Sequence, residues 1–276
     1  YYTMINHENK KDNVVFIHAN GFPPASYDSI LENLKNNYEV DNFLLRPLWK
    51  EISDYRNLKS WEIFCEDFEK FLNNSKTKKN IGLGHSIGGN IILHTAIKKP
   101  DFFSKIILLD PTLFPPKIIF VWKLLNMFNL QDKILDLSKS AKNKKMHYKS
   151  YNELYNNYRK KEIFKLINDE NLKLYIDSII KINVDKSIDI TYSNHWERII
   201  YNKGLLKDNY IWKNINNLKI PCLIIRAHKS TALPLSSIKK IKKKNKFIKI
   251  ETMTNVTHLF PFEEPKIVIK KINNFI

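Results

Sequence analysis

The feature that most constrains the fold of this chain is a glycine-rich turn between an apolar run and a helical stretch. Residues 84–88 read Gly-His-Ser-Ile-Gly; the residues before them are apolar, and those after them have helical spacing. In that context the G-x-S-x-G pattern predicts a sharp strand-to-helix turn that presents its serine above a sheet. A side chain at Gly84 or Gly88 would crowd such a turn. We therefore expect Ser86 to be a nucleophile, because the helix N-terminus behind it favours negative charge.

Short apolar runs and helical stretches alternate through much of the chain. Apolar runs that we interpret as buried strands lie at 14–17, 43–45, 81–83, 105–109, 221–225 and 247–251. Stretches with helical spacing lie at 27–34, 61–72, 87–97 and 238–244, and a last helix is expected after Pro265. Strands that alternate with helices indicate a parallel sheet with helices on both faces. The sequence thus predicts the α/β class with a mostly parallel central sheet.

The alternation stops between residues 113 and 215. Helical candidates follow one another there, with no clear buried strand, at 118–128, 133–141, 151–158, 172–182 and 196–201. We interpret 1–112 and 216–276 as one α/β core and 113–215 as a helical lid inserted in it. The lid is rich in aromatic residues, so we expect some of them to line an apolar pocket beside Ser86.

The chain carries a formal net charge of +18, which is compatible with an anionic partner such as nucleic acid, acidic lipid or an acidic substrate. Its basic residues are mostly scattered lysines. The arginines are Arg46, Arg56, Arg159, Arg198 and Arg226. Because specific nucleic-acid readers rely on arginine forks, we attribute the charge to a biased composition and expect no nucleic-acid partner.

Other features argue against several classes of protein. The two cysteines, Cys65 and Cys222, form neither a disulfide framework nor a zinc-site pattern, so we expect a reducing cytoplasm. No run of about 18 apolar residues occurs, so no integral membrane segment is expected. The N-terminal residues lack a signal-peptide pattern. We expect no metal and no cofactor, and a small-molecule substrate as the partner; the oligomeric state is left open.

Three stretches of the chain resemble the α/β-hydrolase superfamily, in particular its lid-bearing, bacterial esterase-like serine hydrolases. They are His-Ala-Asn-Gly-Phe-Pro at 18–23, Gly-His-Ser-Ile-Gly-Gly at 84–89, and His-Leu-Phe-Pro-Phe-Glu at 258–263. The resemblance covers nearly the whole chain in the order of its elements and is weakest in the lid. It implies the α/β-hydrolase fold and a catalytic triad in the chain order Ser, acid, His.

A serine hydroxyl needs a base before it can act as a nucleophile, and the resemblance implies a histidine in the loop after the last strand. His258 occupies that position. The tetrahedral intermediate also needs backbone amide donors, which form an oxyanion hole. We expect one donor to be the amide of Ile87, next to the nucleophile. The second should come from the loop after the first strand, with Asn20 as first choice and Phe22 as second.

The acid departs from the commonest pattern of the family. Relatives usually carry Asp in the loop after the penultimate strand, where this chain has Thr231. No Asp or Glu occurs between Asp208 and Glu251. Asp110, which ends the strand after that of the nucleophile, is the substitute that we favour, because a carboxylate there can reach the histidine. The alternatives are Glu251, or a Ser–His dyad in which Asp110 only caps a loop.

These residues predict a serine hydrolase that cleaves the carboxylic ester of a small to medium hydrophobic substrate through an acyl-enzyme on Ser86. Lysine and arginine in the lid could instead recruit an anionic group. Cleavage of a C–C bond, a lactone or an amide by the same residues is the alternative chemistry. A catalytically degenerate binding protein is the alternative of another class, because the usual acid is missing at Thr231. Epoxide hydrolysis and dehalogenation are disfavoured, since those relatives use Asp as the nucleophile.

Overall fold

The computed structural model describes residues 12–51, 54–204, 206 and 208–276. The N-terminal segment in which we expect no signal peptide lies outside the described residues. Within the described part of the chain, no helix is long and apolar enough to cross a membrane.

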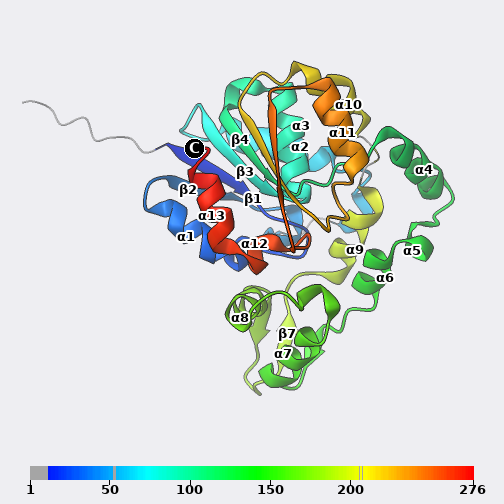
Figure 1. The fold of residues 1–276 in the computed structure, drawn as a ribbon. Helices are drawn as coiled ribbons and strands as arrows, with labels where there is room; N and C mark the ends of the chain where they lie inside the picture. The colour runs from blue at the N-terminus through cyan, green and yellow to red at the C-terminus, as the bar shows by residue number, and fades with distance from the viewer. Residues whose placement is uncertain (1–11, 52–53, 205, 207) are drawn as a thin grey trace, which may run out of the picture.

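A six-stranded sheet forms the centre of the molecule (Figure 1). Its strands are β1 (Asn13–Ile17), β2 (Glu39–Phe43), β3 (Asn80–His85), β4 (Phe103–Leu109), β8 (Cys222–Ala227) and β9 (Ile248–Met253). Their order across the sheet is β2-β1-β3-β4-β8-β9, and each neighbouring pair is parallel. Parallel neighbours need crossover connections, which the intervening segments supply. The predicted α/β class with a parallel central sheet is confirmed.

Helices cover both faces of this sheet, because successive residues of a strand point to opposite faces. The helices of the core are α1 (Asp28–Lys35), α2 (Glu62–Asn73), α3 (Ile87–Lys98), α11 (Leu235–Lys244), α12 (Phe260–Glu263) and α13 (Pro265–Asn273). Val14 and Phe16 of β1 belong to the same buried cluster as residues of α1 and α13. Val15 and Ile17 belong instead to a cluster with residues of α2, α3 and α11. Each face of the sheet thus has its own apolar cluster.

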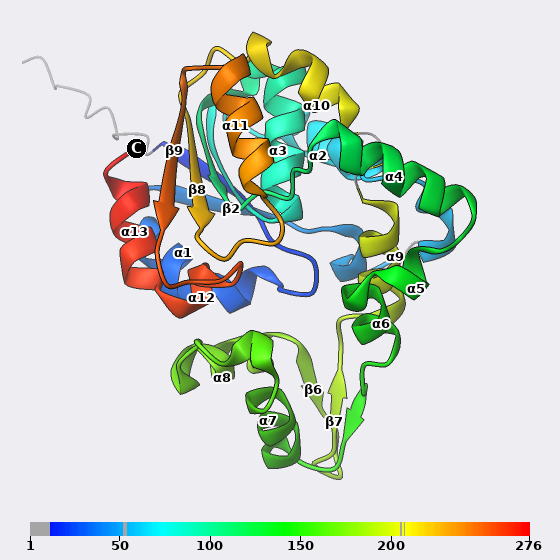
Figure 2. The same ribbon diagram turned by 45° about the vertical axis from the view of Figure 1, so that its right-hand side comes forward.

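Between β4 and β8 the chain forms further helices and a small second sheet, a segment that we call the insertion (Figure 2). Its helices are α4 (Pro116–Met127), α5 (Gln131–Ile134), α6 (Asp136–Lys142), α7 (Tyr151–Arg159), α8 (Asp169–Ser178), α9 (Asn194–Lys203) and α10 (Asn209–Asn214). Its strands β5 (His147–Tyr148), β6 (Ile180–Ile182) and β7 (Ile188–Ile190) form an antiparallel sheet in the order β5-β7-β6. Short 3-10 segments occur in both parts at Pro24–Tyr27, Arg46–Leu48, Tyr55–Asn57, Pro100–Phe102, Glu162–Phe164 and Ile215–Asn217.

The small sheet corrects our expectation that residues 113–215 contain helices alone. The helix expected over 172–182 ends at Ser178, and Ile180–Ile182 is a strand paired with β7. Isoleucine favours the extended backbone, and the buried Ile188 of β7 gives the sheet an apolar side. Strands of two or three residues are too short to produce a periodic pattern, so the sequence could not distinguish them from helix ends.

Strand β2 ends at Phe43, the first residue of the apolar run 43–45 from which we predicted it. It is an edge strand, and most of its residues are exposed and polar. The buried Leu45 lies beyond its end, where the Leu45 amide donates a hydrogen bond to Nε2 of His18 at 3.2 Å. A polar edge strand offers no apolar run, so the pattern pointed to the residues that follow it.

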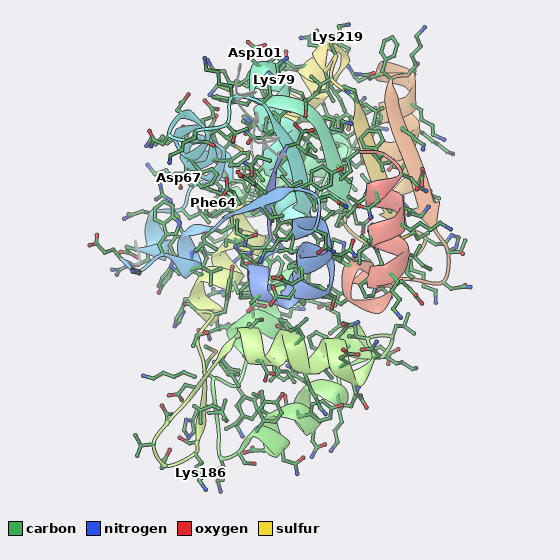
Figure 3. All side chains as sticks on the ribbon, turned by 90° about the vertical axis from the view of Figure 1, so that its left-hand side faces the viewer. Phe64, Asp67, Lys79, Asp101, Lys186 and Lys219 are labelled. Atoms are coloured by element: carbon green, nitrogen blue, oxygen red, sulfur yellow. The ribbon has the colours of Figure 1, made fainter. Side chains whose placement is uncertain are left out.

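The two ends of the parallel sheet have different surroundings. Lys79, Asp101 and Lys219, which precede β3, β4 and β8, gather at the end of the core away from the insertion (Figure 3). Lys186, in the turn between β6 and β7, lies at the opposite end of the molecule. The carboxyl ends of the parallel strands therefore face the insertion, and that edge is where parallel α/β sheets bind their ligands.

Candidate active site

Ser86 occupies a strained turn between β3 and α3. Its backbone angles are φ 57° and ψ −118°, a conformation that a non-glycine residue rarely adopts. The turn is tight, since a Cβ atom on Gly84 would lie 2.6 Å from the backbone of Gly88. The glycines of the motif are therefore required by packing. The predicted strand-to-helix turn around Ser86 is present, and it leaves this side chain half-buried at the carboxyl edge of the sheet.

Three of the predicted side chains form a continuous hydrogen-bonded line. His258 Nε2 lies 2.9 Å from Ser86 Oγ, and His258 Nδ1 lies 2.7 Å from Asp110 Oδ2. The Asp110 side chain is fully buried, whereas that of His258 is 24% exposed. An imidazole that donates from Nδ1 to a carboxylate keeps Nε2 free to accept the serine proton. The arrangement has the geometry that general-base activation of a serine requires.

Asp110 is fixed in this position by strand β8. Its amide donates to the carbonyl of Ile225 at 2.7 Å, and its Oδ1 accepts a hydrogen bond from the amide of Ala227 at 3.2 Å. The residue has φ 41°, so the chain turns sharply as β4 ends. Its second carboxylate oxygen is thereby directed to His258.

The other candidates for the acid lie in different surroundings. The Glu251 carboxylate forms ion pairs with Lys249 at 2.8 Å and Lys271 at 2.6 Å. Hydrogen bonds from these two lysines lower the pKa of Glu251. Thr231, at the usual position of the acid, is exposed. Of the candidates we considered, Asp110 is the one in hydrogen-bond contact with His258.

The amides expected to form the oxyanion hole differ in their availability. Within the described part of the chain, the amides of Ile87 and Asn20 donate no hydrogen bond. The amide of Phe22, our second choice, donates to the carbonyl of Ala19 at 3.1 Å and closes a turn. That turn corrects the expectation for Phe22, because a donor engaged in the loop is not free for a substrate oxygen. Ile87 and Asn20 are left as the candidate pair.

Thr112 contacts Ser86, and the sequence did not single it out. Its Oγ1 lies 3.1 Å from Ser86 Oγ, and its amide donates to the Ser86 carbonyl at 3.0 Å. The Thr112 carbonyl in turn accepts a hydrogen bond from Asn90 Nδ2 at 2.7 Å. Its position two residues after Asp110 was the available signal, because a strand end beside the nucleophile brings the following residues close to it.

His85 is a second residue that the sequence did not single out, and it contacts the backbone of His258. Its Nδ1 accepts a hydrogen bond from the Tyr27 hydroxyl at 2.7 Å, and its Nε2 donates to the His258 carbonyl at 3.0 Å. Burial lowers the pKa of His85 well below its usual range, and the neighbouring His258 adds to this effect. A neutral His85 ring can make both hydrogen bonds at once. It therefore holds the backbone of His258 in place.

His18 plays a similar part in the loop that contains Asn20. Its Nδ1 donates to the carbonyl of Ala19 at 2.8 Å, while its Nε2 accepts from the Leu45 amide. Burial lowers the pKa of His18 to about 4, so the ring is neutral near pH 7. The motif histidine thus fixes the path of the chain just before Asn20.

No group of three or more His, Cys, Asp or Glu side chains in the described residues could hold a metal ion. Cys65 and Cys222 are both buried and free.

Solved structures with the same arrangement of elements include several hydrolases. E-2-(acetamidomethylene)succinate hydrolase is similar with a TM-score of 0.76 and 14% identity, over 96% of this chain and 92% of that one. A peroxisomal alpha-beta-hydrolase of Saccharomyces cerevisiae has a TM-score of 0.74 and 18% identity, over 96% and 76%. The thioesterase domain from the curacin biosynthetic pathway has a TM-score of 0.74 and 13% identity, over 96% and 92%. At these identities the likeness concerns the fold.

Sequence comparison gives a partial match to a characterised enzyme and a broad match to a family. A type I acyl-CoA thioesterase of Penicillium brevicompactum is 28% identical over 130 residues, which are 40% of this chain and 29% of that protein. The matching part thus spans less than a third of that relative. A family model described as alpha/beta hydrolase fold matches residues 46–265, most of the chain. This protein therefore belongs to the α/β-hydrolase family.

Proposed function

We propose that the protein is a serine hydrolase that cleaves carboxylic esters through an acyl-enzyme on Ser86. The observation that carries the proposal is the line from Ser86 Oγ to His258 Nε2 at 2.9 Å and from His258 Nδ1 to Asp110 Oδ2 at 2.7 Å. A serine hydroxyl becomes a useful nucleophile when an adjacent base, itself oriented by a third group, takes its proton. Asp110 would hold the histidine tautomer that this step needs and stabilise the imidazolium that forms.

The proposed reaction has two halves. In the first, His258 Nε2 takes the proton of Ser86 as its Oγ attacks the ester carbonyl. The amides of Ile87 and Asn20 donate to the oxygen that becomes negative, and His258 then protonates the departing alcohol. In the second half, His258 activates a water molecule that releases the acid and restores Ser86. Both halves use the same base and the same amide donors.

We further propose that residues 113–215 act as a lid on a core formed by 1–112 and 216–276. Two contacts between the insertion and the loop that contains Asn20 support this proposal. The Tyr192 hydroxyl donates to Asn20 Oδ1 at 3.1 Å, and Asn20 Nδ2 donates to the carbonyl of Glu197 in α9 at 2.9 Å. The insertion thus holds the side chain of a proposed oxyanion residue, which links lid position to the catalytic site.

Thioester hydrolysis is the second candidate. It would use the same residues, since a thioester is also cleaved by acyl transfer to serine. The partial match to an acyl-CoA thioesterase and the fold likeness to a thioesterase domain support it. C–C bond, lactone and amide cleavage have no specific observation in their favour.

Hydrolysis of p-nitrophenyl butyrate by the wild type and by Ser86→Ala tests the proposal. We expect the Ser86→Ala rate to fall by at least about 10³-fold, because loss of a triad nucleophile costs on the order of 10⁶ in a well-studied serine protease. Ser236→Ala, at an exposed position of α11, is the matched control and should keep the wild-type rate. A wild-type rate no greater than that of Ser86→Ala would instead favour the non-catalytic binding protein.

A further inference from the structure

A charged cluster in the insertion lies against the loop that contains Asn20. We define this lid cluster as Lys144, Tyr158, Lys161 and Glu197. The Glu197 carboxylate approaches the loop so closely that a Cβ atom on Gly21 would lie 3.3 Å from its Oε1. Lys144 Nζ lies 2.7 Å from Glu197 Oε2, and these side chains are only 7% and 15% exposed. Charged side chains in the interior are paired as a rule, and this pair follows it.

Lys161 is the member of the lid cluster without an anionic partner. It is half-buried, and its Nζ lies 3.9 Å from the centre of the Tyr158 ring. Within the described part of the chain it forms no ion pair with a carboxylate. Burial lowers the pKa of Lys161, and the positive charge of Lys144 lowers it further, while Glu197 opposes them. With Glu197 paired to Lys144, the cluster keeps one positive charge, that of Lys161, which no described carboxylate pairs with and which lies in a cluster packed against the loop that contains Asn20.

Tyr158 supplies a second unsatisfied polar group at the same place. Its side chain is 1% exposed, yet its hydroxyl has no hydrogen-bond partner among the residues that the structure describes. A buried hydroxyl without a partner is unfavourable, and a ligand oxygen would satisfy it. The ring is joined to the catalytic loop through Tyr175, which stacks on Phe22 at 4.6 Å and lies 6.0 Å from Tyr158. These ring contacts connect the lid cluster to the loop that contains the proposed oxyanion residue Asn20.

We propose that the lid cluster binds a carboxylate at the far end of the substrate, with Lys161 Nζ as counter-ion and the Tyr158 hydroxyl as hydrogen-bond donor. The inference rests on the proposed serine hydrolase function and names its substrate class, an ester whose apolar body ends in a negative charge. It adds a terminal negative charge to the hydrophobic substrate predicted from the sequence. A carboxylate accepts from both donors, so it compensates the cation and satisfies the hydroxyl together.

Mono-p-nitrophenyl esters of succinate, glutarate and adipate, each compared with its methyl-capped diester, measure the preference for a terminal carboxylate. We expect the wild type to prefer at least one free acid over its capped form by about tenfold in kcat/KM, since a hydrogen bond to a charged group contributes about 1.5–3 kcal/mol. The Lys161→Met variant should lose that preference. Lys160→Met, which removes the same charge from the exposed neighbouring position, should retain it.

Two further experiments show whether the bound carboxylate belongs to the acyl chain or to the leaving alcohol, and test the lid cluster with a second, smaller substitution. The acetate ester of 4-hydroxybenzoate carries its charge on the leaving alcohol instead of the acyl chain. The acetate ester of methyl 4-hydroxybenzoate is its uncharged counterpart. A preference there that depends on Lys161 assigns the lid cluster to the leaving group. Tyr158→Phe removes one hydroxyl from the cluster, and it should lower the same preference several-fold.

The possible results separate this inference from the proposed function. Equal free-acid preference in the wild type, Lys161→Met and Lys160→Met, with hydrolysis that still depends on Ser86, would overturn the lid cluster as a carboxylate site and leave the serine hydrolase standing. Absence of any Ser86-dependent hydrolysis would overturn the proposed function itself. Binding of glutarate to Ser86→Ala, measured by calorimetry and lost in the Ser86→Ala, Lys161→Met double variant, would then support the carboxylate site independently of turnover.

Discussion

Asp110 is the single side chain on which the proposed triad most depends. Its carboxylate is buried, accepts from the Ala227 amide and lies 2.7 Å from His258 Nδ1. Replacement by Asn puts an amide opposite that nitrogen and favours the wrong histidine tautomer. We expect Asp110→Asn to lower kcat for p-nitrophenyl butyrate by about 10³–10⁴-fold, as the loss of a triad Asp does in a serine protease.

The control for this substitution is Asp101→Asn, at the exposed turn before β4. It should leave kcat at the wild-type value. Turnover by Asp110→Asn equal to that of the wild type would remove Asp110 from the triad and point to a Ser–His dyad.

Thr112 is a second single residue whose replacement should change kcat, by a smaller factor than that of Asp110. Its hydroxyl lies 3.1 Å from Ser86 Oγ and can donate to that oxygen while the serine proton is directed to His258. Thr112→Val keeps the shape of the side chain and removes the hydroxyl. Because a neutral hydrogen bond contributes about 1 kcal/mol, we expect about a fivefold change in kcat. Thr112→Ser should restore the wild-type value, and a failure of Ser to do so would assign the effect to packing.

At the scale of elements, a tryptophan links α9 of the insertion to the core. Trp61 Nε1 donates to the carbonyl of Ile200 at 2.8 Å, and the ring leaves no space for a Cβ atom on Gly204. Trp61→Phe removes a buried hydrogen bond, so we expect the free energy of unfolding to fall by about 1–3 kcal/mol in urea titrations.

Trp49→Phe is the comparison for that element contact. Trp49 makes the same kind of hydrogen bond, from its Nε1 to the carbonyl of Leu44 at 2.8 Å, but at an exposed site. Trp49→Phe should lower the free energy of unfolding by less than Trp61→Phe, because water can replace the hydrogen bond to the Leu44 carbonyl. Equal losses in the two variants would show that the α9 contact adds no special stability.

The elements also show what the sequence could predict and what it could not. Buried strands such as β4 and β8 carry continuous apolar runs, so the parallel core was predictable from local pattern. The small sheet of the insertion was not, because its strands span two or three residues and pair across distant parts of the chain. The strand order and the neighbours of each strand depend on such non-local pairing.

The residues of the candidate site also fall into those that the sequence predicted and those that it did not. Ser86, His258 and Asp110 were selected by motif and by position relative to strands, and the structure brings these three together. The contacts of Thr112 and His85 depend on hydrogen bonds across elements that no short motif records. Sequence pattern thus identifies the candidate groups at strand ends. The residues that hold these groups in place can be identified only from the three-dimensional structure.

For the molecule as a whole, Asp208 makes stability depend on pH. Burial raises its pKa from 3.8 to about 7, which a hydrogen bond from Asn90 only partly opposes. Between pH 4 and 7 the folded state therefore binds a proton that the unfolded state has lost, so this group makes stability fall as pH rises through that window. Each unit of pKa difference corresponds to about 1.4 kcal/mol.

Asp208→Asn removes the titration while keeping a polar side chain beside Asn90. We expect its free energy of unfolding, relative to the wild type, to be higher at pH 8 than at pH 5 in urea titrations. A difference between variant and wild type that is the same at both pH values would mean that Asp208 does not titrate in this window.

The central claim, that Ser86 is the nucleophile of the proposed serine hydrolase, is tested most directly by a fluorophosphonate probe and mass spectrometry of the labelled protein. The account predicts one adduct on the wild type, mapped to the peptide that contains Ser86, and no adduct on Ser86→Ala. A wild-type protein that stays unlabelled, or that carries the adduct on a different residue, would contradict it.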